Sequence, residues 1–226
     1  MTSEPSMSPG ASGDPMATDS MAADLRVGLD LKLGEHIILA LKATNAALGA
    51  RTEEFTAYGD LLNTNGTDIG AMIGAAYGPE AEGQFNLIWS AHNGFFVDYT
   101  TGVATDDVAM QDQAVSDLTE VYVPDFSEFI STATGLDLET VTGLITDHVL
   151  QTKAAVDAQA AGDWTLAAAA FRVAFAHMQM IGDALAPAIA TAFPDKFPGD
   201  PSNAGVDLRV ALNQLLQEHL YLATSA

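Results

Sequence analysis

The chain of 226 residues is long enough for one domain of ordinary size with an appended segment. Its net charge of −22, with only 8 basic residues, excludes nucleic acid as a partner, because that affinity comes largely from Lys and Arg neutralising phosphates. The lack of cysteine excludes disulfides, thiolate metal ligands and cysteine nucleophiles. No run of about 20 apolar residues occurs, so no transmembrane segment is predicted.

The first 23 residues differ in composition from the rest of the chain. Residues 1–23 are rich in Ser, Pro, Gly and Asp and carry too little apolar surface to fold, so we interpret them as a disordered tether. This composition is typical of the spacer that follows the lipid-modified residue of bacterial surface lipoproteins. We therefore expect an exported protein at the cell surface or outside the cell, with a lipid anchor supplied upstream of the printed sequence.

Apolar residues recur at spacings of three and four through residues 24–199, and the alternation typical of strands is missing, which predicts an all-α helix bundle. The predicted helices, in chain order, cover residues 24–48, 52–77, 80–105, 108–131, 137–160 and 164–192. They pair as three αα-hairpins joined by short turns. Residues 200–206 are predicted to be a linker, and residues 207–226 a last, orphan helix.

The chain repeats a helix that carries a histidine. Residues 24–43 and 207–226 are identical at 11 of 20 positions, so the orphan helix repeats the first helix. Weaker relatives surround His92 and His148, and the steps from His36 to His92 and from His92 to His148 are both 56 residues. A fixed period predicts an architecture of repeated units, here three hairpins.

These histidines are predicted to meet in the bundle interior. If the hairpins stack alike, His36, His92 and His148 each lie about 18 Å along an outgoing helix. His177 lies as far after the turn at residues 162–163 as His148 lies before it, which adds a fourth imidazole to the layer. Glu35 is the nearest carboxylate, and we include it among the candidate metal ligands.

Imidazole is a ligand for copper, zinc, iron and nickel, and helix bundles build metal sites from inward side chains on facing helices. Duplication copies a structural histidine as readily as a functional one, so the period alone does not decide between a metal site and ordinary core histidines. His177 lies outside the period and favours the metal site. The sequence assigns no role to His219.

Four segments resemble a known protein family. They are LRVGLDLKLGEH, WSAHNGFFVDYTTG, AFAHMQMIGD and FPDKFPG. They resemble an uncharacterised helical domain of secreted proteins from Gram-positive bacteria that is often labelled copper amine oxidase-like, over most of residues 24–199. The resemblance implies an exported helical module associated with copper. It does not imply the oxidase reaction, because the Asn-Tyr-Asp/Glu motif of that enzyme is missing and the enzyme is rich in β-strands.

The sequence therefore predicts an exported, surface-tethered helix bundle that binds a transition metal, copper before the others, for binding, storage or delivery. One alternative is a structural module of the cell surface that forms homo-oligomers head to tail through residues 207–226. A second alternative is a haem-binding or oxygen-active metalloprotein. The paired Glu-x-x-His motifs of di-iron bundles are missing, and no enzymatic reaction is assigned.

Overall fold

The computed structural model describes residues 18–224, which form helices joined by short turns, with no strand among them. The elements are α1 (Met21–Leu48), α2 (Thr52–Tyr77), α3 (Pro79–Ala104), α4 (Val108–Ser116), the π-helix η1 (Asp117–Tyr122), α5 (Val123–Thr134), α6 (Leu138–Ala160), α7 (Trp164–Ala192) and α8 (Ala204–Ala223). The all-α prediction is confirmed. The origin of the hairpins in a repeated unit stays a prediction.

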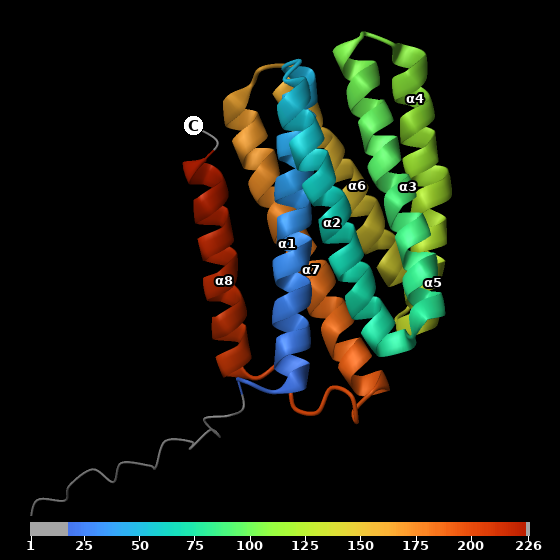
Figure 1. Ribbon diagram of the computed structural model, residues 1–226, viewed down its shortest axis with the longest axis vertical. Coiled ribbons are helices and arrows are strands. Elements are labelled where there is room, and N and C mark those ends of the chain that lie inside the picture. Colours follow the sequence, from blue (N-terminus) through green and yellow to red (C-terminus); the bar gives the residue numbers. More distant parts are fainter. Residues whose placement is uncertain (1–17, 225–226) are drawn as a thin grey trace, which may run out of the picture.

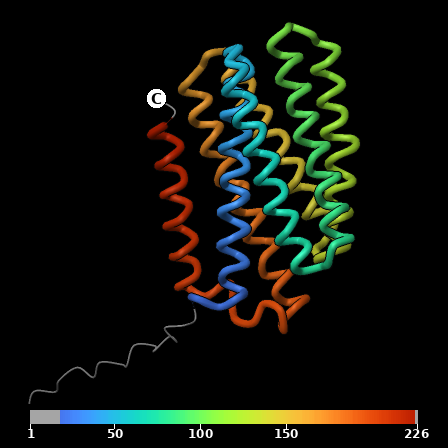
Figure 2. The backbone as a smooth tube through the Cα atoms, viewed as in Figure 1, coloured from blue at the N-terminus to red at the C-terminus, as the bar shows by residue number. Residues whose placement is uncertain are grey.

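The helices pack as three hairpins around α1 (Figure 1). The hairpins are α1 with α2, α3 with the α4–η1–α5 segment, and α6 with α7. The helix α1 contacts α2, α3, α6, α7 and α8, so it is the central element of the fold. Figure 2 shows that α8 flanks the bundle and runs parallel to α1, since both begin at the same end of the molecule.

The first helix begins earlier than the sequence predicted. Ser20 caps α1 by accepting a hydrogen bond from the backbone N–H of Ala23 at 3.2 Å, a common role for serine. Asp24, where the predicted helix begins, pairs with Arg209 at 2.7 Å. Residues 21–23, which the prediction assigned to the tether, therefore belong to α1, and Ala22 and Ala23 are fully buried. The rest of that prediction, residues 1–17, lies outside the described residues.

The return segment of the second hairpin contains a π-helix at residues 117–122, immediately before Pro124 in the first turn of α5. Proline has no N–H to donate to the carbonyl four residues back, so the preceding turn widens instead of continuing as an α-helix. The wider turn changes which side chains of this segment face α3.

One helix of the described part, α7, is long and apolar enough to cross a membrane by length and composition alone. Its most apolar window is 61% buried inside the bundle, where α7 packs between α1 and α6. This burial is what a core helix of a bundle shows.

The last helix packs against the first one. Arg26 of α1 pairs with Asp207 of α8 at 2.7 Å, and Arg209 of α8 pairs with Asp24 of α1 at the same distance. Between these ion pairs lies a small apolar cluster. Its buried members are Ala23, Val27, Val206 and Val210. The helix predicted as an orphan therefore has a partner, and it begins at Ala204, inside the predicted linker.

A buried carboxyl group lies close to these ion pairs. Asp30 of α1 is 3% exposed, and neither of its oxygens has a hydrogen-bond partner. Arg26, one turn away, donates to Asp183 and Asp207 instead. Burial first, and the charge of Asp183 second, raise the pKa of Asp30 to about 8. Asp30 therefore binds a proton in the folded state between about pH 4 and 8 that it lacks in the unfolded state.

This proton linkage gives a prediction for Asp30→Asn. Because folded Asp30 is the more protonated form, its contribution to stability is lost as the pH rises from about 4 to 8. The neutral amide removes that loss, and the matching position of α8 is already Asn213. We expect the variant to raise the free energy of unfolding by about 1–3 kcal/mol at pH 8 and by much less at pH 5. Urea unfolding at both pH values measures this, and equal stability of the two proteins at pH 8 would contradict it.

Candidate metal centre

Three of the predicted histidines meet in the middle of the bundle. His36 of α1, His92 of α3 and His148 of α6 are 2%, 0% and 3% exposed. The ring centroids are 5.3 Å apart for His36 and His92, 6.0 Å for His36 and His148, and 6.2 Å for His92 and His148. One nitrogen of each ring lies within 4.8 Å of those of the other two, which makes the cluster a candidate metal site.

Each histidine occupies a buried stripe of its helix. On α3 the buried side chains follow one another at spacings of four and three, which keeps them on one face. They are Phe85, Trp89, His92, Phe96 and Tyr99. His36 and His148 hold the corresponding inward positions on α1 and α6. Rigid helices therefore fix all three rings, as a preorganised ligand set requires.

The hydrogen bonds leave ring nitrogens free at the cluster. Nδ1 of His92 donates to the carbonyl oxygen of Trp89 at 2.5 Å, which assigns the proton to Nδ1 and a lone pair to Nε2. Nδ1 of His148 lies 3.5 Å from the hydroxyl of Thr152. Nε2 of His92, Nε2 of His148 and Nδ1 of His36 are buried without a partner. Buried polar atoms are nearly always paired, so three such nitrogens in one cluster need an explanation.

Burial keeps the three imidazoles neutral. It lowers the pKa of His92 to about 4, and it lowers the pKa of His148 to about 3, with smaller contributions from charge on His92 and His177. The pKa of His36 is also lowered well below its ordinary value, by burial and then by its two neighbours. Neutral imidazole is the form that binds metal, so no proton has to leave these nitrogens at pH 7.

Aromatic rings enclose the cluster. The ring of Trp89 lies 4.6 Å from that of His36 and 4.7 Å from that of His92, and Tyr122 stacks on His92 at 4.6 Å with an angle of 15°. The sequence did not single out these two residues. The π-helix that ends at Tyr122 shifts the register of this segment and brings Tyr122 against His92. A tryptophan three residues before the histidine, on the same helix face, was the signal for Trp89.

Two of the predicted ligands lie outside the cluster. Nε2 of His177 donates to the carbonyl oxygen of Leu144 at 2.7 Å, so this histidine has its own backbone partner. The carboxylate of Glu35 accepts hydrogen bonds from Lys32 at 3.0 Å and from Asn65 at 2.9 Å. His219 is exposed on α8. The structure therefore brings together three of the five predicted ligands.

The packing around the cluster leaves no room for a haem. The internal cavity that His148 lines has a volume of about 20 Å³, which is about the space of one water molecule. Its other lining residues are apolar or aromatic and come from α1, α2, α3, η1, α5, α6 and α7. A haem between these rings would require the helices to separate, so the described core fits a single ion far better than a macrocycle.

Comparisons with known proteins identify no relative. A scan against models of protein families finds no match. Neither the search of curated proteins nor the search of solved structures finds one. The functional argument therefore depends on the chemistry of the described residues.

Proposed function

We propose that this protein binds a transition-metal ion through His36, His92 and His148. The single observation that carries the proposal is the convergence of three buried imidazoles, each with a nitrogen that lacks a hydrogen-bond partner. Leaving one buried polar atom unpaired costs about 1–3 kcal/mol. Three such costs at one point are offset if the nitrogens bind an ion.

The ligand set favours copper, and Cu(I) in particular. Imidazole ligates copper, and among divalent ions a given nitrogen site binds Cu(II) more tightly than zinc, nickel or iron; the preference for Cu(I) comes from the lack of countercharge. The cluster has no carboxylate within the described residues, so the full charge of the ion would be buried without a countercharge. A monovalent ion reduces that cost, whereas a zinc ion bound by three histidines would need a water or substrate as its fourth ligand. Metal–nitrogen bonds of about 2.0 Å place the ligand atoms about 3.5 Å apart, so small ring rotations would close the site.

The proposed role is binding, storage or delivery of copper by an exported protein. The net charge of −22 attracts cations to the molecule, and the three helices that carry the ligands hold them in a buried site. The composition of the N-terminal residues and the resemblance to secreted helical domains support export and attachment to the cell surface. No reaction is assigned to the cluster.

Tryptophan fluorescence gives a direct test of binding. Trp89 lies against two of the ligands, whereas Trp164 is 62% exposed at the start of α7. In a Trp164→Phe variant only Trp89 emits, and we expect one equivalent of Cu(I), added anaerobically with a reductant, to quench most of its emission. The control is the Trp89→Phe variant, in which the emission of Trp164 should stay nearly constant. Unquenched Trp89 together with a metal-free protein after dialysis would refute the proposal.

A further inference from the structure

The outward face of α8 is apolar and uncharged. Its exposed leucines are Leu208, Leu212, Leu215, Leu216 and Leu220, each between 51% and 65% exposed. The other exposed positions from 208 to 223 are Ala211, His219, Leu222 and Ala223. None of these side chains is a carboxylate, a lysine or an arginine, although the chain carries a net charge of −22. A continuous apolar face on such an acidic protein marks an interaction surface.

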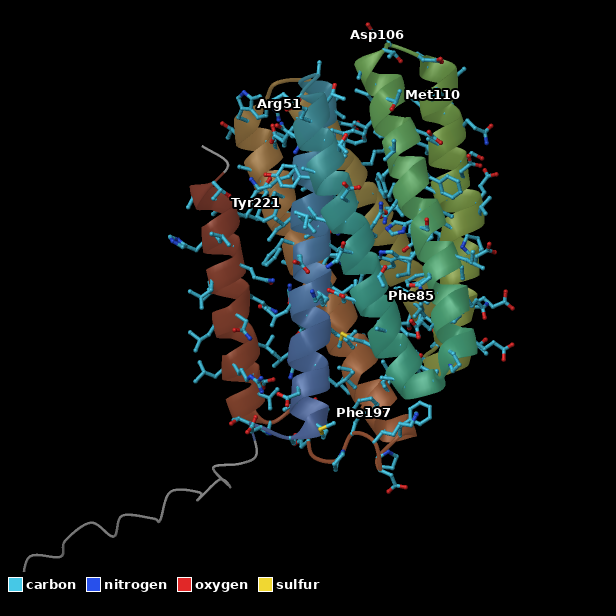
Figure 3. All side chains as sticks on the ribbon, viewed as in Figure 1. Arg51, Phe85, Asp106, Met110, Phe197 and Tyr221 are labelled. Carbon is cyan, nitrogen blue, oxygen red and sulfur yellow. The ribbon has the colours of Figure 1, made fainter. Side chains whose placement is uncertain are left out.

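The same face is buried in the first helix. Leu208, Leu212 and Leu216 match Leu25, Leu29 and Leu33 of α1 in the repeated sequence. The three leucines of α1 are 6%, 1% and 4% exposed, because α2 and α7 cover them. The two copies of this helix therefore differ in one respect: a partner covers the leucine face of α1, and none covers that of α8 within the described chain (Figure 3).

The two copies already pair with each other through their other faces. The ion pairs Arg26–Asp207 and Arg209–Asp24 join equivalent positions reciprocally, and Val27 and Val210 meet between them. This is the arrangement of two parallel helices related by an approximate two-fold axis. Because α1 uses the inward face of α8, only the outward face remains for a further partner.

Exchange of α8 for α1 in a neighbouring molecule, the head-to-tail alternative, fits the structure poorly. Gly34 of α1 matches Gln217 of α8, and a Cβ at Gly34 would lie 2.9 Å from Nε2 of Gln179 and 3.0 Å from the ring of Phe175. Thr224 would also have to replace the core residue Leu41. The outward face of α8 therefore needs a partner that leaves α1 in place.

We propose that the outward faces of α8 from two copies of this chain pack together as a homodimer with two-fold symmetry. Five positions on this face alternate at spacings of four and three residues, which is the seam of paired helices. They are Leu208, Leu212, Leu215, His219 and Leu222. Such a seam is self-complementary, as a two-fold interface requires. It also lies on the flanking helix, so two molecules can approach without collision of their other helices (Figure 1).

Electrostatics favours this face over the rest of the surface. Two copies repel each other strongly because each carries a charge of −22. Contact through the leucine face buries no carboxylate. Salt screens the repulsion between the two acidic molecules but does not weaken the apolar contact between them. Dimerisation should therefore strengthen at higher ionic strength.

Sedimentation velocity of the full chain at several concentrations and at low and high salt tests the proposal. We expect twice the mass of one chain, and we expect Leu212→Glu with Leu216→Glu to weaken the dimer at least 100-fold while circular dichroism stays unchanged. The matched control is Leu87→Glu with Leu150→Glu, which adds the same charge at exposed leucines of α3 and α6 and should leave the dimer intact. A wild-type monomer at all concentrations, or equal effects of both double variants, would overturn the proposal.

Discussion

Replacing His92 with phenylalanine should lower the affinity for Cu(I) at least 100-fold. Phenylalanine keeps a ring that stacks on Tyr122 and fills the same space, but it removes both nitrogens. Loss of a group that hydrogen-bonds to a metal ligand typically costs about 10–100-fold in affinity, so loss of the ligand itself should cost at least the upper end of this range. Competition with a chromophoric Cu(I) chelator measures the change.

The control for this variant is the same substitution at an unrelated histidine. His219 is exposed on α8 and lies outside the cluster, so His219→Phe should keep the wild-type affinity. His177→Gln should also keep most of it, because His177 donates to a backbone carbonyl and not to the candidate site. Equal affinities of the His92 and His219 variants would contradict the assignment of ligands.

The free energy of unfolding of the metal-free protein should begin to fall at pH values well above those at which ordinary carboxylates bind protons. The pKa values of His92 and His148 are lowered to about 4 and about 3 in the folded state, and that of His36 is lowered as well. An unfolded histidine titrates near 6.5, so below this pH the unfolded chain binds more protons than the folded one. The contribution of these histidines to the free energy of unfolding is therefore fully present above about pH 6.5 and is lost as the pH falls towards the pKa values of the folded state.

The expected size of this loss is on the order of 4 kcal/mol between pH 7 and 5 for the three histidines together. Urea unfolding measures it most clearly in the Asp30→Asn background, since Asp30 has the opposite pH dependence in the same range. Adding His92→Phe should reduce the loss by about one third, to match the two remaining rings. A pH profile unchanged by that substitution would mean that His92 is not buried in its neutral form.

The sequence predicted the convergence of His36, His92 and His148 because equal spacing on parallel helices puts side chains at one height. It failed where local geometry decides which way a side chain points. His177 lies as far from the turn between α6 and α7 as His148 does, but its ring donates to the carbonyl oxygen of Leu144 and does not join the cluster. The carboxylate of Glu35 lies at the edge of α1, where it accepts a hydrogen bond from Lys32 and does not reach the cluster.

Other parts of the site depend on deviations from regular helices. Tyr122 faces His92 because a π-helix precedes Pro124, and helical periodicity counted at 3.6 residues per turn cannot show such an insertion. The sequence also could not predict which face of α8 packs against the bundle. This helix packs on α1 through the face opposite its exposed leucines, where the reciprocal Arg–Asp pairs lie.

X-ray absorption spectroscopy of the Cu(I)-loaded protein tests the central claim most directly, because it reports the ligands of the bound ion. The account predicts one copper per chain with about three imidazole nitrogens at about 2.0 Å, and loss of that signal in the His92→Phe variant. Copper surrounded by carboxylate oxygens, or bound equally well by that variant, would contradict it.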